Sequence, residues 1–337
     1  MARRDAILSA VVEAERLHRV FHTKARAAAG EGRIDVFGML VDRDIPMMFR
    51  PLRSLLGAYI DEPDRGVIVT TLRPLPVQRF TAAHELGHAA LGHQTSLDNE
   101  DLLTRALFVS EAVFDLREIQ ANAFATQLLT PSWLIVQHMK QQGWTRANLA
   151  NPVVVYQLAL RMGSSYSAMC YALTESKGID RPTCERLLKI KPKAIKQSLA
   201  RPYEPERWYG DVWLVTERDN GMILEGSRSD LVVLKFEEHA SSGYVWQFGE
   251  LADAGLAIME DGRAANADTQ QHIGGVVFRT VIAQAHDGAS GHIRLREVRP
   301  WHVAGEPLQS LEFEVDLSGP VPAGLLPRQR EALLGVA

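Results

Sequence analysis

Two histidines and a glutamate in one short segment have the residue types and the spacing needed to bind a metal ion and activate water. The segment is Arg79-Phe-Thr-Ala-Ala-His-Glu-Leu-Gly-His88, in which His84 and His88 stand four residues apart and Glu85 follows the first. Residues four apart on an α-helix return to nearly the same face, so both imidazoles can reach one ion. Glu85 lies about a quarter-turn away, where its carboxylate can serve as a general base. A bare HExxH pattern also occurs by chance, without a metal.

Such a site needs a third protein ligand, and the sequence offers two candidates. His93 lies five residues past His88, which rotates it about 140° around the helix, and Gly92 is expected to end that helix. We therefore interpret His93 as a residue at the helix end, close to the negative end of the helix dipole. The better candidate is Glu118, on a second predicted helix that begins at about Leu116 and ends just before Pro131.

The second helix can supply both a ligand and a supporting group. Glu118 and Asn122 are four residues apart and share a face. Glu118 would complete a His-His-Glu set with an open fourth position, and Asn122 could accept a hydrogen bond from a ligand imidazole. Gly87 on the first helix would let a neighbouring element approach closely. Periodicity alone favours a simpler interpretation, in which Glu118 is a solvated charge.

Together the two blocks resemble the ImmA/IrrE family of bacterial and phage metallopeptidases. The second block is Glu118-Ile-Gln-Ala-Asn-Ala-Phe-Ala-Thr-Gln-Leu-Leu-Thr-Pro131, and both blocks match that family in order and spacing. The resemblance implies that His84, His88 and Glu118 hold one zinc ion and that Glu85 is the base. It also implies a zincin-like fold.

Outside the metal set, the resemblance is less complete. Thr130 stands where the family usually has a methionine. Upstream, two stretches resemble the strands that precede the zinc helix of that family. The first extends from residues 34–37 to residues 50–51, and the second from residues 56–59 to residues 67–69. We therefore expect strands in both stretches.

Members of this family cleave helix-turn-helix transcriptional repressors at one site and so switch on mobile-element or stress-response genes. The resemblance thus implies a site-specific zinc endopeptidase with such a repressor as its protein substrate. The rival function is that of a DNA-binding or partner-binding regulator whose zinc site is not catalytic. Glu85 argues against this rival, because a purely structural zinc site needs no general base.

Composition limits where the chain can work. Its 337 residues, 46% of them hydrophobic, predict two or three domains with ample core. No run of about 18 apolar residues appears, and residues 1–5 lack the apolar core of a signal peptide. We therefore expect a cytoplasmic protein without membrane contact, in which Cys170 and Cys184 are unpaired core thiols.

Positive charge is concentrated in one segment. The whole chain carries −4, whereas residues 132–200 hold ten Lys or Arg against three acids, which gives +7 and leaves −11 for the rest. Residues 153–162 and 166–173 are predicted helices around a turn at 163–165, a helix-turn-helix pattern. This pattern resembles the helical region that follows the peptidase core of the ImmA/IrrE family. Clustered Lys and Arg attract DNA or an acidic partner, but we favour a packed helical subdomain because the second helix has an apolar core pattern.

The pattern changes to strands after residue 200. Residues 201–209 are predicted to be a linker. Beyond them, four stretches are rich in β-branched residues: 211–216, 230–236, 275–283 and 292–298. Gly- and Asp-rich turns separate these stretches. Short strands spaced in this way are typical of an immunoglobulin-like β-sandwich.

Three loops of this region resemble those of chagasin-like inhibitors, small immunoglobulin-like domains that plug the cleft of papain-type cysteine peptidases. The loops are residues 241–246, 274–275 and 299–305, within a match over residues 210–318. Ser241 and Ser242 stand where that family usually has Asn-Pro-Thr. This departure leaves open whether the sandwich inhibits a peptidase, recognises a substrate or senses a ligand.

Three aromatic residues in these loops are candidates for binding a partner. Tyr244, Trp246 and Trp301 would offer contact area at low entropic cost. The alternative is that they are core residues. Burial tendencies favour this alternative for Trp246 and leave it open for Trp301.

The predicted organisation is α+β. It comprises a zincin-like metallopeptidase core at 1–131, a basic helix-turn-helix-like subdomain at 132–200, a linker at 201–209, a chagasin-like sandwich at 210–320 and a C-terminal tail at 321–337. The predicted function is zinc-dependent cleavage of a repressor, with the sandwich as a recognition or sensing module. DNA binding through residues 132–200 is the less favoured option.

Overall fold

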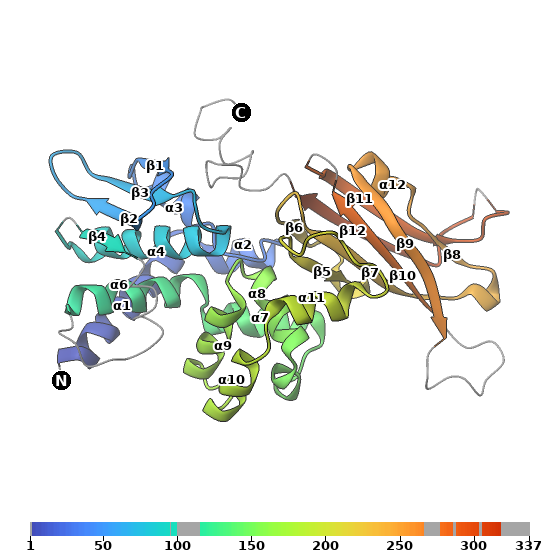
Figure 1. The fold of residues 1–337 in the computed structure, drawn as a ribbon, viewed down its shortest axis with the longest axis horizontal. Coiled ribbons are helices and arrows are strands. Elements are labelled where there is room, and N and C mark those ends of the chain that lie inside the picture. Colours follow the sequence, from blue (N-terminus) through green and yellow to red (C-terminus); the bar gives the residue numbers. More distant parts are fainter. Residues whose placement is uncertain are drawn as a thin grey trace. The chain divides into compact units, whose positions relative to one another are not determined.

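The computed structural model describes residues 2–94, 96–99, 115–265, 277–285, 288–302 and 305–317. It divides the chain into two compact units, which contain both helices and sheets, as the α+β prediction requires (Figure 1). The first unit is drawn from Met1–Lys140 and Trp144–Lys189, the second from Gln141–Gly143 and Ile190–Gly319. The predicted five-part organisation is finer than this division and stays a prediction.

The first unit combines a small sheet with a set of helices. Its elements are α1 (Ala2–Val20), α2 (Thr23–Ala28), α3 (Val36–Val41), β1 (Met47–Arg50), β2 (Leu55–Ile60), β3 (Gly66–Thr70), α4 (Leu75–Leu91), β4 (Ser96–Asn99), α6 (Leu116–Leu129), α7 (Ser132–Gln142), the 3-10 helix η1 (Arg146–Ala150), α8 (Pro152–Arg161), α9 (Tyr166–Glu175) and α10 (Arg181–Leu188). The strands are in the order β1-β3-β2-β4, with β1 parallel to β3 and the other pairs antiparallel.

One predicted strand is a helix. Residues 34–37 were expected to begin a strand, but Val36–Val41 forms α3. The reason is local: the carboxylate of Asp35 accepts a hydrogen bond from the backbone N–H of Gly38 at 3.0 Å and so caps the helix. The remaining expected strands are present as β1, β2 and β3.

Helix α4 lies at the centre of the first unit. It packs against β2 and β3 on one side and against α6 and α1 on another (Figure 1). Its end is the predicted one, because Gly92 follows Leu91 in the left-handed conformation, with φ of 71°. The second predicted helix is present as α6: Asp115 caps it through the N–H of Arg117, and it ends at Leu129, shortly before Pro131.

Helix α1 covers α6 through small and aliphatic side chains. Ala10, Ala14 and Leu17 of α1 are fully buried. The buried His18 adds a polar tie, with Nδ1 at 2.9 Å from the hydroxyl of Thr23 and Nε2 at 3.3 Å from the carbonyl oxygen of Gln127 on α6. A neutral imidazole fits both contacts, because Nε2 can donate to the carbonyl while Nδ1 accepts from the hydroxyl.

The helices after α7 form the predicted pair around a glycine turn. Ser165 caps α9 by accepting from the N–H of Ala168, and Gly163 in the turn has φ of 62°. Three apolar residues of α9 are buried: Tyr166, Met169 and Leu173. Cys170 and Cys184 are buried and free, as expected. The inner face of α9 is therefore core.

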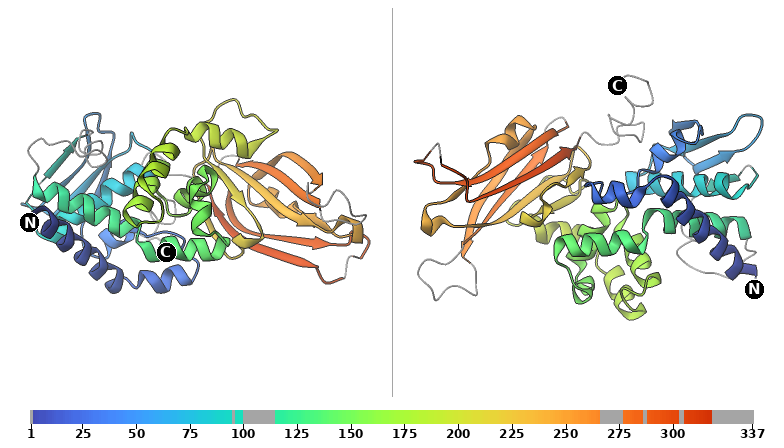
Figure 2. Two further views of the ribbon diagram at one scale, coloured as in Figure 1. Left: turned by 90° about the horizontal axis from the view of Figure 1, so that it is seen from below. Right: turned by 180° about the vertical axis from the view of Figure 1, so that it is seen from behind.

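The second unit contains two four-stranded sheets, which form two layers (Figure 2). Its elements are α11 (Pro192–Ala200), β5 (Val212–Val215), η2 (Glu217–Asp219), β6 (Ile223–Glu225), β7 (Leu231–Glu238), η3 (Ala240–Ser242), β8 (Val245–Gln247), α12 (Gly249–Asp253), β9 (Leu256–Ala265), β10 (Val277–Ala285), β11 (Ser290–Val298) and β12 (Gln309–Asp316). The sheet orders are β5-β7-β10-β9 and β6-β12-β11-β8. All four predicted strands are present, as β5, β7, β10 and β11; residues 275–276 of the third lie outside the described residues.

The segment around residue 200 packs with the second unit. Helix α11, the last part of the predicted subdomain at 132–200, belongs to that unit. Ala200 at its end joins a buried cluster with Val212 and Leu231. The predicted linker 201–209 also packs on this cluster, through Tyr203 and Trp208. These contacts of partly buried aromatic residues make the stretch part of the second unit.

Among the helices in the described part of the chain, none has the length and apolar character needed to cross a membrane.

His18 predicts a pH-dependent contribution to stability. Burial lowers its pKa from the ordinary value of 6.5, so the unfolded chain binds a proton that the folded chain resists. The stability that the neutral ring contributes is present above pH 6.5 and is lost as the pH falls below it towards the folded-state pKa. We expect the free energy of unfolding, measured in urea between pH 7.5 and 5.5, to fall more in the wild type than in His18→Gln. Equal pH dependence in the two proteins would contradict this role.

Candidate metal centre

Helices α4 and α6 bring three of the predicted residues together. His84 and His88 project from α4 and Glu118 from α6, and one ligand atom from each lies within 4.8 Å of the others. Within the described residues this is the one such group of three or more His, Cys, Asp or Glu side chains. Both histidines are buried, while the Glu118 side chain keeps 20% of its surface exposed. Glu118 is thus the member of the group that is partly exposed to solvent.

The three side chains point their lone pairs at a common position. The two Nε2 atoms are 3.0 Å apart, Glu118 Oε2 is 3.2 Å from Nε2 of His84, and Oε1 is 3.5 Å from Nε2 of His88. Lone pairs of two imidazole nitrogens and a carboxylate at these distances repel one another unless a proton or a metal cation lies between them. Two His nitrogens with one carboxylate are also the ligand set of catalytic zinc sites, so the residues present fit a zinc ion.

The environment keeps Glu118 ionised. Burial would raise the pKa of its carboxyl, but hydrogen bonds and the charge attraction from His84 and His88 outweigh burial and hold that pKa well below its usual range. An ionised carboxylate is the form that binds a cation.

Each histidine of the group has a partner on its other ring nitrogen. Nδ1 of His84 is 3.0 Å from the amide oxygen of Asn122, the position that the sequence predicted for a supporting group. Nδ1 of His88 is 3.0 Å from Nδ1 of His93. Burial is the main cause that lowers the pKa of His93, which favours its neutral form. The contact between His93 and His88 was not predicted from the sequence.

The close crossing of the two helices depends on Gly87. A Cβ at this position would come within 3.0 Å of the Phe124 ring and 3.2 Å of the Cα of Ala121, both on α6. A larger residue would therefore push α6 away from α4. The predicted close approach at Gly87 is confirmed, and it sets the distance over which Glu118 reaches the histidines.

Glu85 lies on the sheet side of α4 and is fully buried. An added Cβ on Gly57 of β2 would lie 2.9 Å from its Oε1 and 2.4 Å from Cγ2 of Thr81. The absence of a side chain at Gly57 thus makes room for the Glu85 carboxylate between helix and strand. The role of Glu85 as base stays a prediction at this point.

Arg79, the first residue of the histidine block, is on α4, and its side chain is buried. Its guanidinium donates to the carbonyl oxygen of Ile34, and its Nε lies next to Gly163, where an added Cβ would come within 2.7 Å. Burial lowers its pKa to about 10, partly offset by the charge of Asp35. Arg79 thus connects α4 to two loops of the first unit and does not belong to the metal group.

In the second unit, the three candidate aromatic residues have different surroundings. Trp246 is only 3% exposed, its ring packs 4.9 Å from that of Phe236, and its indole N–H donates to the carbonyl oxygen of Glu237. The predicted partner-binding role of Trp246 is therefore wrong, since the ring is in the core. Trp301 is 72% exposed, and Tyr244 is half-buried with the Arg299 guanidinium 4.5 Å from its ring centre.

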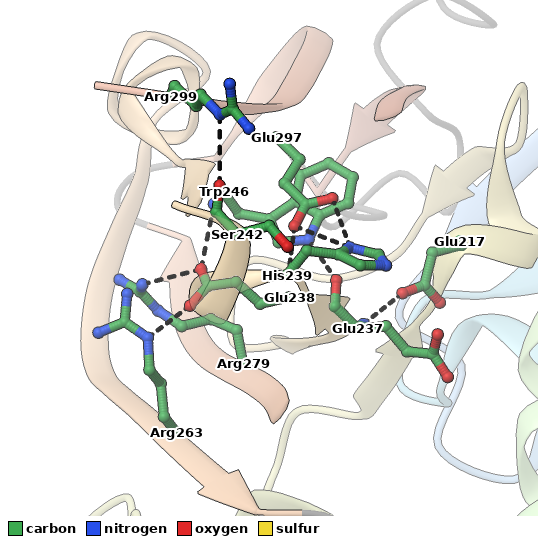
Figure 3. A network of polar contacts seen from close by, with 10 residues as sticks. All are labelled: Glu217, Glu237, Glu238, His239, Ser242, Trp246, Arg263, Arg279, Glu297 and Arg299. Carbon is green, nitrogen blue, oxygen red and sulfur yellow. Dashed lines mark hydrogen bonds and ion pairs between the residues drawn. The ribbon is translucent and has the colours of Figure 1, made fainter. Parts of the chain in front are cut away.

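Two buried carboxylates fix the loop that carries Tyr244 (Figure 3). Glu297 accepts from the backbone N–H of His239 at 2.6 Å and lies 3.1 Å from its ring Nδ1. Glu238 accepts from the N–H of Trp246 at 3.1 Å and pairs with Arg263 and with Arg279. Both carboxylates are fully buried. The predicted loop at 274–275 lies outside the described residues.

Comparison with known proteins identifies the segment that carries the metal group. Residues 43–174 match the family Peptidase_M78, described as the IrrE N-terminal-like domain. The resemblance inferred from the sequence is confirmed for this segment. Over 134 residues the chain is 34% identical to the "Radiation response metalloprotease IrrE" of Deinococcus radiodurans, a match that covers 39% of this chain and 37% of that protein. The chain thus spans less than half the length of this relative.

Two further similarities concern the C-terminal region. The chain is 25% identical over 107 residues to "Amoebiasin-2" of Entamoeba histolytica, which covers 32% of this chain and 86% of that protein. Among solved structures, the cysteine protease inhibitor EhICP2 from the same organism matches at 24% identity over 32% of this chain and 96% of its own, with a TM-score of 0.29.

Within the segment that matches the IrrE N-terminal-like domain, we expect Gly87→Leu to damage the metal group. Overpacking of a close helix crossing costs about 1–3 kcal/mol of unfolding free energy, and displacement of α6 would separate Glu118 from His84. Urea unfolding and zinc affinity by chelator competition measure the two effects. Gly249→Leu is the matched control, because an added Cβ there meets no atom within 4 Å. If both variants bind zinc like the wild type, the crossing does not set the site.

Proposed function

We propose that this protein is a zinc-dependent, site-specific endopeptidase. The observation that carries the proposal is the group of His84, His88 and Glu118, whose ligand atoms lie within 4.8 Å of one another. The group is in the segment that matches the IrrE N-terminal-like domain, and the relative from Deinococcus radiodurans is named a metalloprotease. Glu85, next to the first histidine, adds the base that peptide hydrolysis requires.

The three side chains of the group would hold the ion and leave a fourth position for water or substrate. Bound zinc supplies Lewis-acid polarisation of the scissile carbonyl and makes water acidic enough to lose a proton near neutral pH. Asn122 holds the His84 ring in one orientation, because its amide oxygen accepts from Nδ1 and leaves Nε2 for the ion.

Glu85 is the proposed general base. Its carboxylate takes the proton from the attacking water and later returns it to the leaving amine. Burial on α4 keeps this group out of bulk water, so that it can exchange a proton with the reacting groups without competition from solvent. Its contact with Gly57 limits the positions that the carboxylate can take.

The proposed substrate is a helix-turn-helix transcriptional repressor, whose cleavage would derepress stress-response or mobile-element genes. Support for it comes from the resemblance of the two blocks to the ImmA/IrrE family. The competing function is that of a DNA-binding or partner-binding regulator with a non-catalytic zinc site. The basic residues of the helical region favour it, but the buried inner face of α9 fits a packed subdomain equally well.

Glu85→Gln separates the two functions. We expect the variant to bind zinc like the wild type but to lose cleavage by about 100-fold or more, because a general base contributes roughly 10²–10⁴-fold. The measurement is a comparison of new protein N-termini by mass spectrometry, with each form expressed in the native host under stress. The proposal requires one new terminus within a helix-turn-helix repressor in the wild type only.

Glu185→Gln on α10 is the matched control, since Glu185 is an exposed residue that pairs only with exposed Arg181 among the ion pairs described. It should cleave like the wild type. Identical termini in the wild type and Glu85→Gln would exclude the peptidase function and favour the regulator.

We also propose that the second unit recognises a partner through Tyr244 and Trp301. Exposed tryptophan and a tyrosine stacked with arginine are the residue types that dominate binding energy at protein interfaces. Arg299 Nε lies 3.3 Å from the carbonyl oxygen of Ser242, so the two loops that carry these rings are bonded to each other. Recognition of the peptidase substrate and sensing of a signal are both consistent with such a surface.

Two tryptophans distinguish surface from core in this unit. We expect Trp301→Ala to change the free energy of unfolding by no more than about 0.5 kcal/mol, because its ring is largely exposed. Trp246→Ala should lower it by about 3–5 kcal/mol, because it empties a core position. Urea unfolding of the full chain measures both, and a similar loss in the two variants would remove Trp301 as a free contact residue.

A further inference from the structure

We propose that His93 is a positioning residue of the metal centre, which holds the His88 ring with Nε2 towards the ion through a directed chain of hydrogen bonds. This inference rests on the proposed zinc binding. From the sequence, His93 was interpreted only as a residue at the end of α4, and its contact with His88 was not expected.

The local backbone brings His93 back to His88. A continued helix would rotate it about 140° away, but Gly92 ends α4 with φ of 71°. The backbone N–H of His93 then donates to the carbonyl oxygen of His88 at 2.9 Å, and the two Nδ1 atoms lie 3.0 Å apart. His93 is thus tied to the same residue through its backbone and its side chain, and only 8% of it is exposed.

The geometry of His88 sets the direction of the first hydrogen bond, if this residue is to bind a metal ion. Nε2 of His88 faces Glu118 and His84, so it must carry a lone pair to bind a cation. A neutral imidazole has one N–H, which therefore lies on Nδ1 of His88 and donates to Nδ1 of His93. The accepting ring then carries its own proton on Nε2.

The hydrogen bonds that follow have the donors and acceptors that this direction requires. Nε2 of His93 lies 3.2 Å from the amide oxygen of Gln120 on α6, which can only accept. The amide nitrogen of Gln120 donates to the hydroxyl of Ser9 at 2.9 Å, and that hydroxyl donates to the carbonyl oxygen of Ala6 at 2.8 Å. This series of hydrogen bonds extends from the metal group to the backbone of α1, and in each bond one group donates and the other accepts.

The two metal histidines are therefore supported in different ways. His84 has a fixed acceptor in the Asn122 amide oxygen, whereas His88 has an imidazole that could donate or accept. Gln120 removes this ambiguity, because its amide oxygen binds the tautomer of His93 that accepts at Nδ1. Without these partners, the proton of His88 could move to Nε2 and block the metal position.

The test compares wild type, His93→Ala and His93→Gln as full chains. Two readouts are used: the dissociation constant for zinc from competition with a chelator, and the proton position on His88 in the metal-free protein from ¹⁵N NMR of the imidazole nitrogens. In His93→Ala we expect zinc to bind about 10–100-fold more weakly, with the His88 proton shared between Nδ1 and Nε2. In His93→Gln, the amide oxygen replaces the acceptor, so both readouts should return towards wild type.

Gln120→Leu is the second variant, and it leaves both metal-binding helices and His93 in place. It should move the His88 proton in the same sense as His93→Ala, by a smaller amount. The inference is overturned if His93→Ala binds zinc like the wild type with the proton on Nδ1, or if His93→Gln is no better than His93→Ala. The variants could follow these expectations for zinc binding while the wild type cleaves no protein. That result would support the role of His93 and would overturn only the proposed peptidase function.

Discussion

The site depends on one close contact, the crossing of α4 and α6 at Gly87. Two of the metal-binding residues are on one helix and the third is on the other, so the distance between the helices determines whether a single ion can reach all three. The crossing brings Gly87 against Phe124 and Ala121 of α6, without a side chain between the backbones. The same contact places Asn122 beside His84. Helix α6 therefore supplies both the carboxylate and a support for the opposite ligand, and neither would reach across a wider crossing.

A buried polar site of this kind requires partners for every ring nitrogen, because an unpaired polar group in the interior costs more than a pair contributes. The chain meets this requirement from several segments: Asn122 from α6 for one histidine, and His93 for the other. Near the beginning of α4, the buried Arg79 guanidinium donates to the carbonyl oxygen of Ile34. The central helix is consequently held at its beginning, its middle and its end by polar contacts to other parts of the first unit, which limits its freedom to rotate about its axis.

Fixed spacing explains which parts of the site could be predicted. His84, His88, Glu118 and Asn122 follow the helical repeat, so their shared faces are visible in the sequence. The contact of His93 was not, because it depends on the left-handed turn at Gly92 and not on the repeat. Similarly, the family resemblance implied a strand from residue 34, but the cap at Asp35 produces a helix. The packing of Tyr203 and Trp208 on the sheet that contains Val212 and Leu231 likewise could not be predicted from a segment rich in proline and charge.

The two tryptophans of the second unit show why residue type alone does not identify a surface. Trp246 is on β8, opposite the buried Glu297 of β11, and strand alternation directs its ring into the core beside Phe236. Trp301 follows the end of β11, where alternation no longer applies, and its ring lies exposed over Gly243. The buried Glu238 and Glu297 hold the strand ends between these positions. Because these hydrogen bonds already order the backbone of the Tyr244 loop, that loop would lose little conformational freedom on meeting a partner.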